Sequence, residues 1–293
     1  MANLKEVRTR ITSVSSTQQI TSAMKMVSAA KFRRAQNAIV GMRPYADQLQ
    51  EIIADIDTGD GLVTPYHDQR PMQNVLVVVV TSNKGLCGAF NSNVLKQAQQ
   101  RLDHYRAALP EGGQLHVMSI GKKSSELLVR QKDLILTTHD GLLDSPSFDA
   151  IASLADTVMQ RFTDKQIDRV EVIYNQFKNS LTQILSTEQF LPVAGDAKAD
   201  TAAGAMANDY IYEPSKEEIL REMVPLTLRS TFYRIILDSL ASEHGARMTA
   251  MQKATDNATE LLKDLTLSYN KARQAAITNE IIEIVSGSEA LKG

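Results

Sequence analysis

Hydrophobic and small side chains recur every seven residues near the end of the chain, from Leu226 to about Ser286. This stretch of 61 residues contains no proline and a single glycine, Gly245, and Pro225 stands where a helix can begin. One set of seven-residue positions is Leu237, His244, Met251, Ala258, Leu265 and Ala272, and the other is Ala241, Met248, Thr255, Leu262, Tyr269 and Ala276. Two such positions per heptad predict a coiled-coil helix. The helix would be about 90 Å long, whereas a compact chain of this size measures roughly 50 Å across, so we expect it to extend beyond a globular body.

A second long helix is predicted over residues 4–57, because apolar residues recur there at steps of three and four. They are Leu4, Val7, Ile11, Val14, Met24, Val27, Ala38, Met42, Tyr45, Leu49, Ile52 and Ile56. The stripe is polar between Thr12 and Thr21, so this part is expected to be held by a neighbouring helix. Pro44 should kink the helix or end a turn, and residues 58–61 should stop it. If the two long helices pair, they are antiparallel and the C-terminal helix overhangs.

Between Met72 and Val193 the pattern changes to alternating strands and helices. The predicted strands are 75–80, 115–120, 134–138, 169–175 and 183–190, and the predicted helices are 92–108, 122–131 and 148–162. This order favours a Rossmann-like α/β domain, with a mostly parallel sheet between two helical layers and an antiparallel last strand. The predicted fold is therefore a central α/β domain with an antiparallel two-helix coiled coil made by the chain's ends. The predicted domains are 1–57, 72–194, 195–214 and 215–287, and residues 194–208 read as a flexible loop.

Charge and composition narrow the function. The net charge is only −2, yet residues 1–43 carry eight basic residues and one acidic residue, a charge of +7. This asymmetry predicts an acidic partner, and nucleic acid is disfavoured because Phe32 is the only aromatic residue in the segment. The single cysteine, Cys87, indicates a reducing compartment. No apolar run approaches the ~18 residues of a membrane-spanning helix, so direct membrane insertion is not expected. The acid-poor start is compatible with a presequence, but the helical pattern from Leu4 favours a structural helix.

The loop Thr81–Gly88 is the one place where the sequence raises the question of a ligand. It follows a strand and precedes a helix, where phosphates often bind, but it matches no established nucleotide-binding motif. The simpler interpretation is that Gly85 and Gly88 permit a tight turn. The five histidines are scattered, and Cys87 has no neighbouring histidine in the sequence. We therefore expect no catalytic residue, metal or cofactor. We also expect that the isolated chain does not hydrolyse ATP and that Lys84, in the loop, has no catalytic role.

Three segments identify a family. Residues 246–257 (ARMTAMQKATDN), 268–287 (SYNKARQAAITNEIIEIVSG) and 17–27 (TQQITSAMKMV) closely resemble the gamma subunit of F-type ATP synthase. The loop after the first strand is also similar to that family, which usually has Asp where Asn83 stands. The resemblance covers the chain essentially end to end. It implies a non-catalytic rotor subunit that couples proton-driven rotation of a membrane c-ring to ATP synthesis.

The resemblance also implies partners and the residues that meet them. The implied partners are a ring of three alpha and three beta subunits, the epsilon subunit and the c-ring, at the cytoplasmic face of a bacterial inner membrane. Met24, Arg247, Gln274, Thr278 and Glu283 match family positions that face the catalytic ring. The basic residues Lys25, Arg33 and Arg34 are expected to face it as well, because of their charge. Ile277, Ile281 and Ile284 would form a bearing tip, and Tyr210, Tyr212 and Glu213 belong to a foot. Thiol regulation is not expected, because Cys87 is alone.

On physical grounds alone, two other classes stay open. A nucleotide-binding α/β enzyme would need the loop Thr81–Gly88 to hold phosphate, which soaking with ATP or NAD would test. A basic coiled-coil adaptor for an acidic partner, nucleic acid or lipid would bind polyanions with steep salt dependence. The apolar tip residues, with Ile282 and Val285, could also be ordinary packing rather than a partner surface.

Overall fold

The computed structural model describes residues 4–56, 64–127, 134–179, 182–193 and 213–290. The chain divides into two compact units, one of residues 1–29 with 247–293 and the other of residues 30–246. Helices α1 (Leu4–Ile56) and α5 (Lys216–Ala290) contribute to both units. This division cuts through both helices, whereas the domain borders inferred from the sequence follow element ends; those borders stay a prediction. The predicted stop at 58–61 and the predicted flexible loop 194–208 lie outside the described residues.

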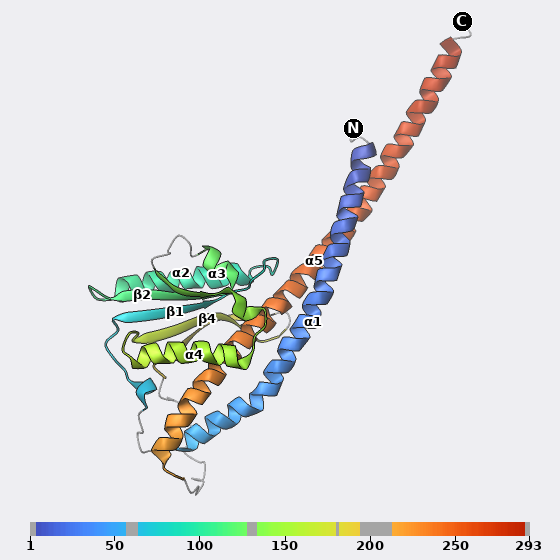
Figure 1. Cartoon of the computed structure of the whole chain (residues 1–293). Helices are drawn as coiled ribbons and strands as arrows, with labels where there is room; N and C mark the ends of the chain where they lie inside the picture. Colours follow the sequence, from blue (N-terminus) through green and yellow to red (C-terminus); the bar gives the residue numbers. More distant parts are fainter. Residues whose placement is uncertain (1–3, 57–63, 128–133, 180–181, 194–212, 291–293) are drawn as a thin grey trace. The chain divides into compact units, whose positions relative to one another are not determined.

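The larger unit is built on a five-stranded sheet in the order β3-β2-β1-β4-β5 (Figure 1). The strands are β1 (Asn74–Val80), β2 (Gln114–Ile120), β3 (Ile135–His139), β4 (Arg169–Phe177) and β5 (Gln183–Leu191). The first four are parallel, with β1 between β2 and β4, and β5 is antiparallel to β4. Every residue of β1 after Asn74 is buried, as expected for a central strand covered on both faces. The prediction of a mostly parallel sheet with an antiparallel edge is confirmed.

Helices cover both faces of this sheet, as the alternating pattern predicted. Helix α2 (Phe90–Ala108) lies on one face, where it packs against β1 and β2, and α4 (Phe148–Thr163) lies on the other. The shorter helix α3 (Lys122–Leu127) follows β2, and the rest of the predicted helix 122–131 lies outside the described residues. The described part of the larger unit also contains the 3-10 helices η1 (Pro65–His67) and η3 (Asp140–Leu143).

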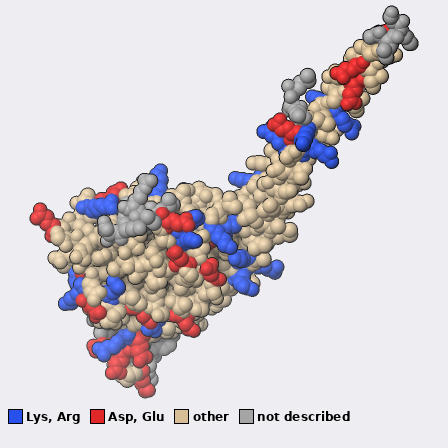
Figure 2. Space-filling model, turned by 45° about the horizontal axis from the view of Figure 1, so that its top comes forward, with Lys and Arg blue, Asp and Glu red and all other residues tan. Residues whose placement is uncertain are grey.

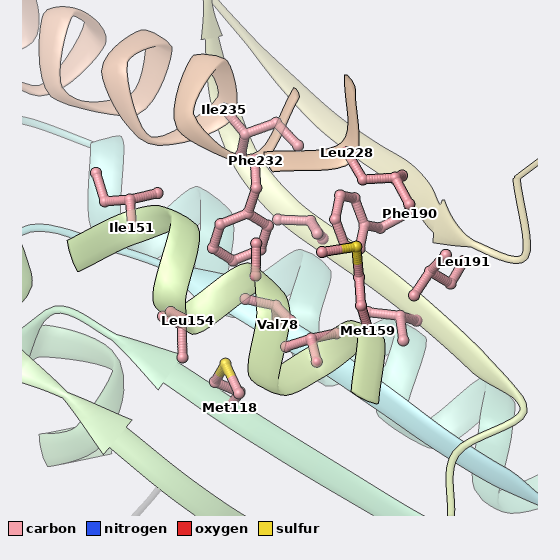
Figure 3. Packing of buried hydrophobic residues seen from close by; sticks show 14 of the residues in the cluster. Val78, Met118, Ile151, Leu154, Met159, Phe190, Leu191, Leu228, Phe232 and Ile235 are labelled. Atoms are coloured by element: carbon pink, nitrogen blue, oxygen red, sulfur yellow. The ribbon is translucent and has the colours of Figure 1, made fainter. Parts of the chain in front are cut away.

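The first part of α5 belongs to the core of the α/β domain, which the narrow heptad pattern did not predict. Its buried side chains join the cluster formed by α4, β4 and β5 (Figure 3). They are Leu220, Val224, Leu228, Phe232, Ile235, Ile236 and Leu240. Burial of one such side chain contributes about 1.5–3 kcal/mol, so this part of α5 is fixed mainly by the domain rather than by a second helix.

Helix α5 begins at Lys216, next to residue 215, where the sequence places the start of the C-terminal helical region, and ahead of Pro225. The Ser215 side chain accepts a hydrogen bond from the backbone N–H of Glu218 at 3.2 Å, as an N-cap does. The helix then runs through Pro225, so this proline does not start it. A proline inside a helix removes one backbone hydrogen bond, and here the buried Val224 and Leu228 on either side hold the helix against the domain.

The second half of α1 packs within the larger unit. Phe32 meets Phe177 edge to face at 5.5 Å between ring centroids, and Ile39 packs with Leu237 and Ala241 of α5. Helix α1 continues through Pro44 to Ile56, so the proline does not end it. Three positions of the predicted apolar stripe are instead exposed: Val27, Tyr45 and Ile52. The apolar pattern of one helix does not determine which of two adjacent faces of that helix is covered by the neighbouring helix.

The smaller unit is an antiparallel pair formed by the start of α1 and the end of α5. Gln18 contacts Thr259 and Thr21 contacts Thr255, so positions rise along α1 as they fall along α5. The predicted heptad positions from Met251 to Ala272 are protected from solvent, since Met251 and Ala258 are buried and Thr255, Leu262, Leu265, Tyr269 and Ala272 are half-buried, whereas the last predicted position, Ala276, is exposed. The sequence therefore predicted this seam correctly, and the antiparallel coiled coil is confirmed.

Candidate functional site

The seam between the two helices is partly polar. Gln18 Nε2 donates to Thr259 Oγ1 at 2.7 Å, and the hydroxyls of Thr21 and Thr255 are 2.8 Å apart. The sequence predicted that the polar part of α1 is held by a neighbour, and these contacts confirm it. Polar pairs in a coiled-coil seam fix the register of the helices at some cost in stability. These polar contacts therefore fix how the two helices are aligned, although the seam is only partly apolar.

Beyond Ala272 the end of α5 has no described neighbour. Every residue from Arg273 to Glu289 is exposed, which confirms the predicted overhang. The exposed residues include the predicted bearing-tip residues Ile277, Ile281 and Ile284, the last of which is 70% exposed. Ile282 and Val285 are exposed as well, so the interpretation of these side chains as ordinary packing is not supported. An exposed apolar surface of this kind generally marks an interaction site.

The structure places the other predicted partner residues differently. Arg33, Arg34, Gln274, Thr278 and Glu283 are exposed, as a partner contact requires. Met24 and Lys25 are half-buried, and Arg247 is only 7% exposed. Glu213 is exposed, whereas Tyr210 and Tyr212 lie outside the described residues. The partner roles of these residues stay predictions.

Sequence analysis missed an exposed apolar surface on α1. Ile20, Met26 and Val27 are each more than half exposed. Their side chains point away from the seam because Thr21 and Ser28 occupy it. The sequence feature that could have revealed this surface is the spacing of the polar residues. In this part of α1 the small hydroxyl side chains, rather than the larger apolar ones, lie on the face that meets the other helix.

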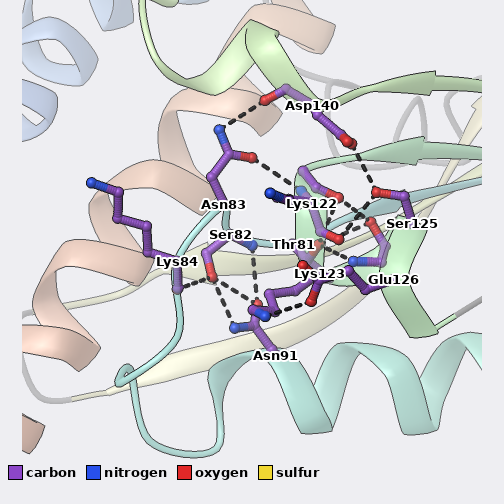
Figure 4. A network of polar contacts seen from close by, with 12 residues as sticks. Thr81, Ser82, Asn83, Lys84, Asn91, Lys122, Lys123, Ser125, Glu126 and Asp140 are labelled. Atoms are coloured by element: carbon purple, nitrogen blue, oxygen red, sulfur yellow. Dashed lines mark hydrogen bonds and ion pairs between the residues drawn. The ribbon is translucent and has the colours of Figure 1, made fainter.

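The loop Thr81–Gly88 is closed by its own hydrogen bonds (Figure 4). Asn91 Oδ1 accepts from the Ser82 backbone N–H at 3.0 Å, and Asn91 Nδ2 donates to Ser82 Oγ at 2.8 Å. Cys87 is buried, with its Sγ 3.2 Å from Asn91 Nδ2. Gly88 has φ of +62°, which supports the prediction that it permits the turn. Gly85 has no such φ and has open space around it, so the turn does not require glycine there.

The same loop also covers the start of α3. The backbone N–H groups of Lys122, Lys123 and Ser124 donate to Asn83 Oδ1, the Ser82 carbonyl and Thr81 Oγ1 respectively. Gly121, at φ +98°, lets the two loops approach, because an added Cβ there would lie 2.3 Å from the Thr81 carbonyl oxygen. These donors are already used, so this edge of the sheet supports packing rather than phosphate binding.

Asn83 has a chemical reason to be an amide. Its Nδ2 donates to the Asp140 carbonyl at 2.7 Å and to Asp144 Oδ1 at 3.1 Å, while its Oδ1 accepts from Lys122. A carboxylate at position 83 could not donate to Asp144 and would repel it. These hydrogen bonds therefore explain why Asn is suitable at position 83, where the family it resembles usually has Asp.

Burial is the chief cause of the pKa shift at four titratable groups of the α/β domain. Burial lowers the pKa of His116 and His139 and raises the pKa of Tyr105 to about 12. Burial likewise raises the pKa of Tyr174. These directions keep the four groups neutral near pH 7, so the shifts reflect core packing rather than an acid–base pair.

Among the residues that the structure describes, no group of three or more His, Cys, Asp or Glu side chains could hold a metal ion. No helix within the described ranges is long and apolar enough to cross a membrane. On the face shown in Figure 2, Lys and Arg side chains are interspersed with Asp and Glu over the α/β domain rather than gathered in a patch of one sign.

Comparison with known proteins gives one consistent result. A family model described as ATP synthase matches residues 3–291. The chain is 55% identical to the ATP synthase gamma chain of Flavobacterium johnsoniae, with all of both chains covered. It is 50% identical to that of Cytophaga hutchinsonii, with 99% of each chain covered.

Solved structures show the same fold. A chain of the central stalk and c-ring assembly of the Tetrahymena thermophila mitochondrial ATP synthase is 27% identical and has a TM-score of 0.62, with 80% of this chain and 99% of that chain covered. A chain of the Euglena gracilis mitochondrial ATP synthase is 21% identical with a TM-score of 0.67, covering 98% of this chain and 94% of that one. The extent of the family match and the identity over the whole length lead to one conclusion: the chain belongs to the family of ATP synthase gamma chains.

Proposed function

We propose that the chain works as the central-stalk rotor of an F-type ATP synthase, and that it couples proton-driven rotation of a c-ring to ATP synthesis. A gamma chain is a non-catalytic subunit of the peripheral F1 sector, and catalysis belongs to the beta subunits. The observation that carries the proposal is the exposed end of α5 from Arg273 to Glu289. An apolar helix end without a neighbour among the described residues suits a sleeve made by other subunits.

The catalytic ring of three alpha and three beta subunits is the proposed partner of the coiled coil. The exposed side chains Gln274, Thr278 and Glu283 would face this ring, and Ile277, Ile281 and Ile284 would form the bearing. Met24, Lys25, Arg33 and Arg34 would face it from α1. Arg247 is buried, so its contribution would require that the ring reach it or that its side chain move.

The c-ring and the epsilon subunit are the proposed partners of the foot. Glu213 is its exposed member among the described residues, beside Tyr210 and Tyr212 in the sequence. In a bacterial cell this arrangement puts the chain at the cytoplasmic face of the inner membrane. The alternative of a nucleotide-binding enzyme has little support, because the Ser82 backbone N–H already donates to Asn91, and Asn83 and Thr81 of the same loop accept from backbone N–H groups of α3.

Copurification tests the proposal most directly. The full-length chain, tagged and expressed in its own cells, should bring down a nucleotide-binding hexamer together with membrane-sector subunits. A tagged chain that purifies alone or with nucleic acid, under conditions that preserve ATP synthase complexes, would contradict the proposal.

Reversing the basic charges of α1 should weaken coupling more than folding. In the variant Lys25→Glu/Arg33→Glu/Arg34→Glu, the changed charges are exposed at Arg33 and Arg34 and half-buried at Lys25. Exposed charges contribute only about 0–1 kcal/mol each to stability, whereas like charges at an acidic partner surface cost several kcal/mol. We expect reduced ATP-driven proton pumping in membrane vesicles, with little change in the urea midpoint of the isolated chain. The triple Gln variant, which removes the charges without reversing them, is the control. Unchanged pumping by the Glu variant would rule out a partner role for these residues.

Removal of the exposed end of α5 should loosen the complex without stopping the ring. Truncation after Ala276 deletes the three bearing isoleucines, whose burial in a sleeve contributes about 1.5–3 kcal/mol each at most. We expect complexes that dissociate more readily and synthesise ATP less efficiently but still hydrolyse it. The measurements are subunit retention on gel filtration and ATP hydrolysis per assembled complex. Loss of hydrolysis in fully assembled complexes would show instead that the tip is essential for catalysis.

A further inference from the structure

The attachment of α5 to the α/β domain combines a broad apolar contact with directional polar contacts. The apolar part consists of side chains such as Leu228, Phe232 and Ile235, which pack against Phe190 and α4 (Figure 3). Hydrophobic contact depends on buried area and has no preferred direction. Rolling the helix about its own axis would turn these side chains out of the core and lose their burial, and the polar contacts at the border of the apolar face add a directional constraint on the same motion.

Two ion pairs border this apolar face. Arg229 Nε lies 2.6 Å from Asp156 Oδ1 on α4, and Arg234 Nη2 lies 2.8 Å from Glu188 Oε1 on β5. The two arginines are five residues apart on α5, which corresponds to roughly 140° around the helix after a full turn. The helix is thus held by charge on both sides of the apolar contact, once to a helix and once to the edge strand.

The second pair continues into the sheet. Glu188 Oε2 accepts a hydrogen bond from the Tyr174 hydroxyl at 2.8 Å, and Tyr174 is fully buried on β4. Both carboxylate oxygens of Glu188 are therefore engaged, one by the helix and one by the sheet. Arg234 is also 3.7 Å from Asp238 one turn further along α5. Because Tyr174 is held by the core, Glu188 cannot follow Arg234 if the helix turns.

We propose that Arg234 and Glu188, oriented by Tyr174, act as a torsional key that stops α5 from rolling on the α/β domain and transmits torque between them. The inference rests on the proposed rotor function, in which force enters the chain at the domain and leaves it through the coiled coil. A rotation by one residue position, about 100°, would move the guanidinium away from Glu188 and break the contact. These are positioning residues: they touch neither nucleotide nor the membrane ring.

The test compares coupling with stability in the complete complex. The variants are Arg234→Gln, Glu188→Gln and their combination, each in inverted membrane vesicles with subunit content checked. Arg221→Gln is the matched control, because Arg221 is an exposed arginine of the same helix. The readout is ATP-driven proton pumping divided by ATP hydrolysis, with thermal unfolding of the full-length chain measured in parallel.

The key predicts that each single variant lowers pumping per ATP hydrolysed and that the double variant is no worse than either single one. Arg234→Lys should recover part of the loss, since an ammonium can pair with Glu188 but lacks the guanidinium fork. A normal ratio of proton pumping to ATP hydrolysis in assembled complexes of the variants would contradict the proposed role, whether or not the unfolding temperature falls. The ion pair would then be only a structural contact. Losses that add in the double variant would contradict the proposed role as well. The wild-type vesicles separate this failure from failure of the rotor function, because they must pump protons in either case if the rotor proposal holds.

Discussion

ATP synthesis is expected to be abolished by Ala258→Pro while the α/β domain remains folded. Ala258 is only 8% exposed and lies on the seam, between the cross-helix contacts of Thr255 and Thr259. Proline there removes a backbone hydrogen bond and clashes with the preceding turn, which costs about 3 kcal/mol or more. It also introduces a kink, and the small alanine leaves no slack against α1 to absorb it.

The natural Pro225 shows why position matters. Helix α5 contains Pro225 without ending, but there the buried Val224 and Leu228 attach the helix to a broad core. At Ala258 the only described neighbour is one other helix with a partly polar seam. A kink at this site therefore changes the direction of the helix, because no broad core holds the helix on both sides of the kink.

Synthesis by membrane vesicles, with subunit content determined in parallel, measures the effect. Ala258→Ser is the control, because the small hydroxyl fits the seam, which already contains threonines, and should leave synthesis close to normal. Normal synthesis by assembled Ala258→Pro complexes would mean that this stretch does not bear torque.

Phe232→Ala should destabilise the isolated full-length chain by about 3–5 kcal/mol, as is usual for a buried phenylalanine. Phe232 is fully buried between α5 and the sheet, with its ring centroid 5.3 Å from that of Phe190 (Figure 3). Its removal leaves a cavity where α5 joins the domain. Urea unfolding followed by circular dichroism gives the change in the free energy of unfolding.

Leu267→Ala on the same helix is the matched control. Leu267 is 61% exposed, and surface substitutions usually change stability by no more than about 0.5 kcal/mol. Equal effects of the two substitutions would contradict the assignment of Phe232 to the domain core.

Local sequence pattern determined much of this protein. The central strands and helices are found within a few residues of their predicted bounds, because each has the period of its own element. The heptad positions from Met251 to Ala272 are those that the second helix protects. The overhang also followed from the sequence, since a longer helix paired with a shorter antiparallel one must project beyond it.

The candidate partner residues depended on another kind of information. Gln274, Thr278 and Glu283 came from resemblance to a family, and no local pattern distinguishes them from other exposed polar residues. The structure shows that they are exposed, and that Arg247 is not. Their proposed function lies in contacts with other chains, so their roles depend on the surfaces of those partners.

Only the tertiary structure decided which faces are covered and which distant side chains meet. Val27 matches an apolar stripe yet is exposed, because the seam takes Thr21 and Ser28 instead. The start of α5 belongs to the domain core, although its heptad pattern continues into the coiled coil. Arg234 and Glu188 are 46 residues apart in the chain. The physical reason is that helix and strand periods depend on near neighbours in the sequence, whereas burial and ion pairing depend on how separate elements pack, which no local pattern encodes.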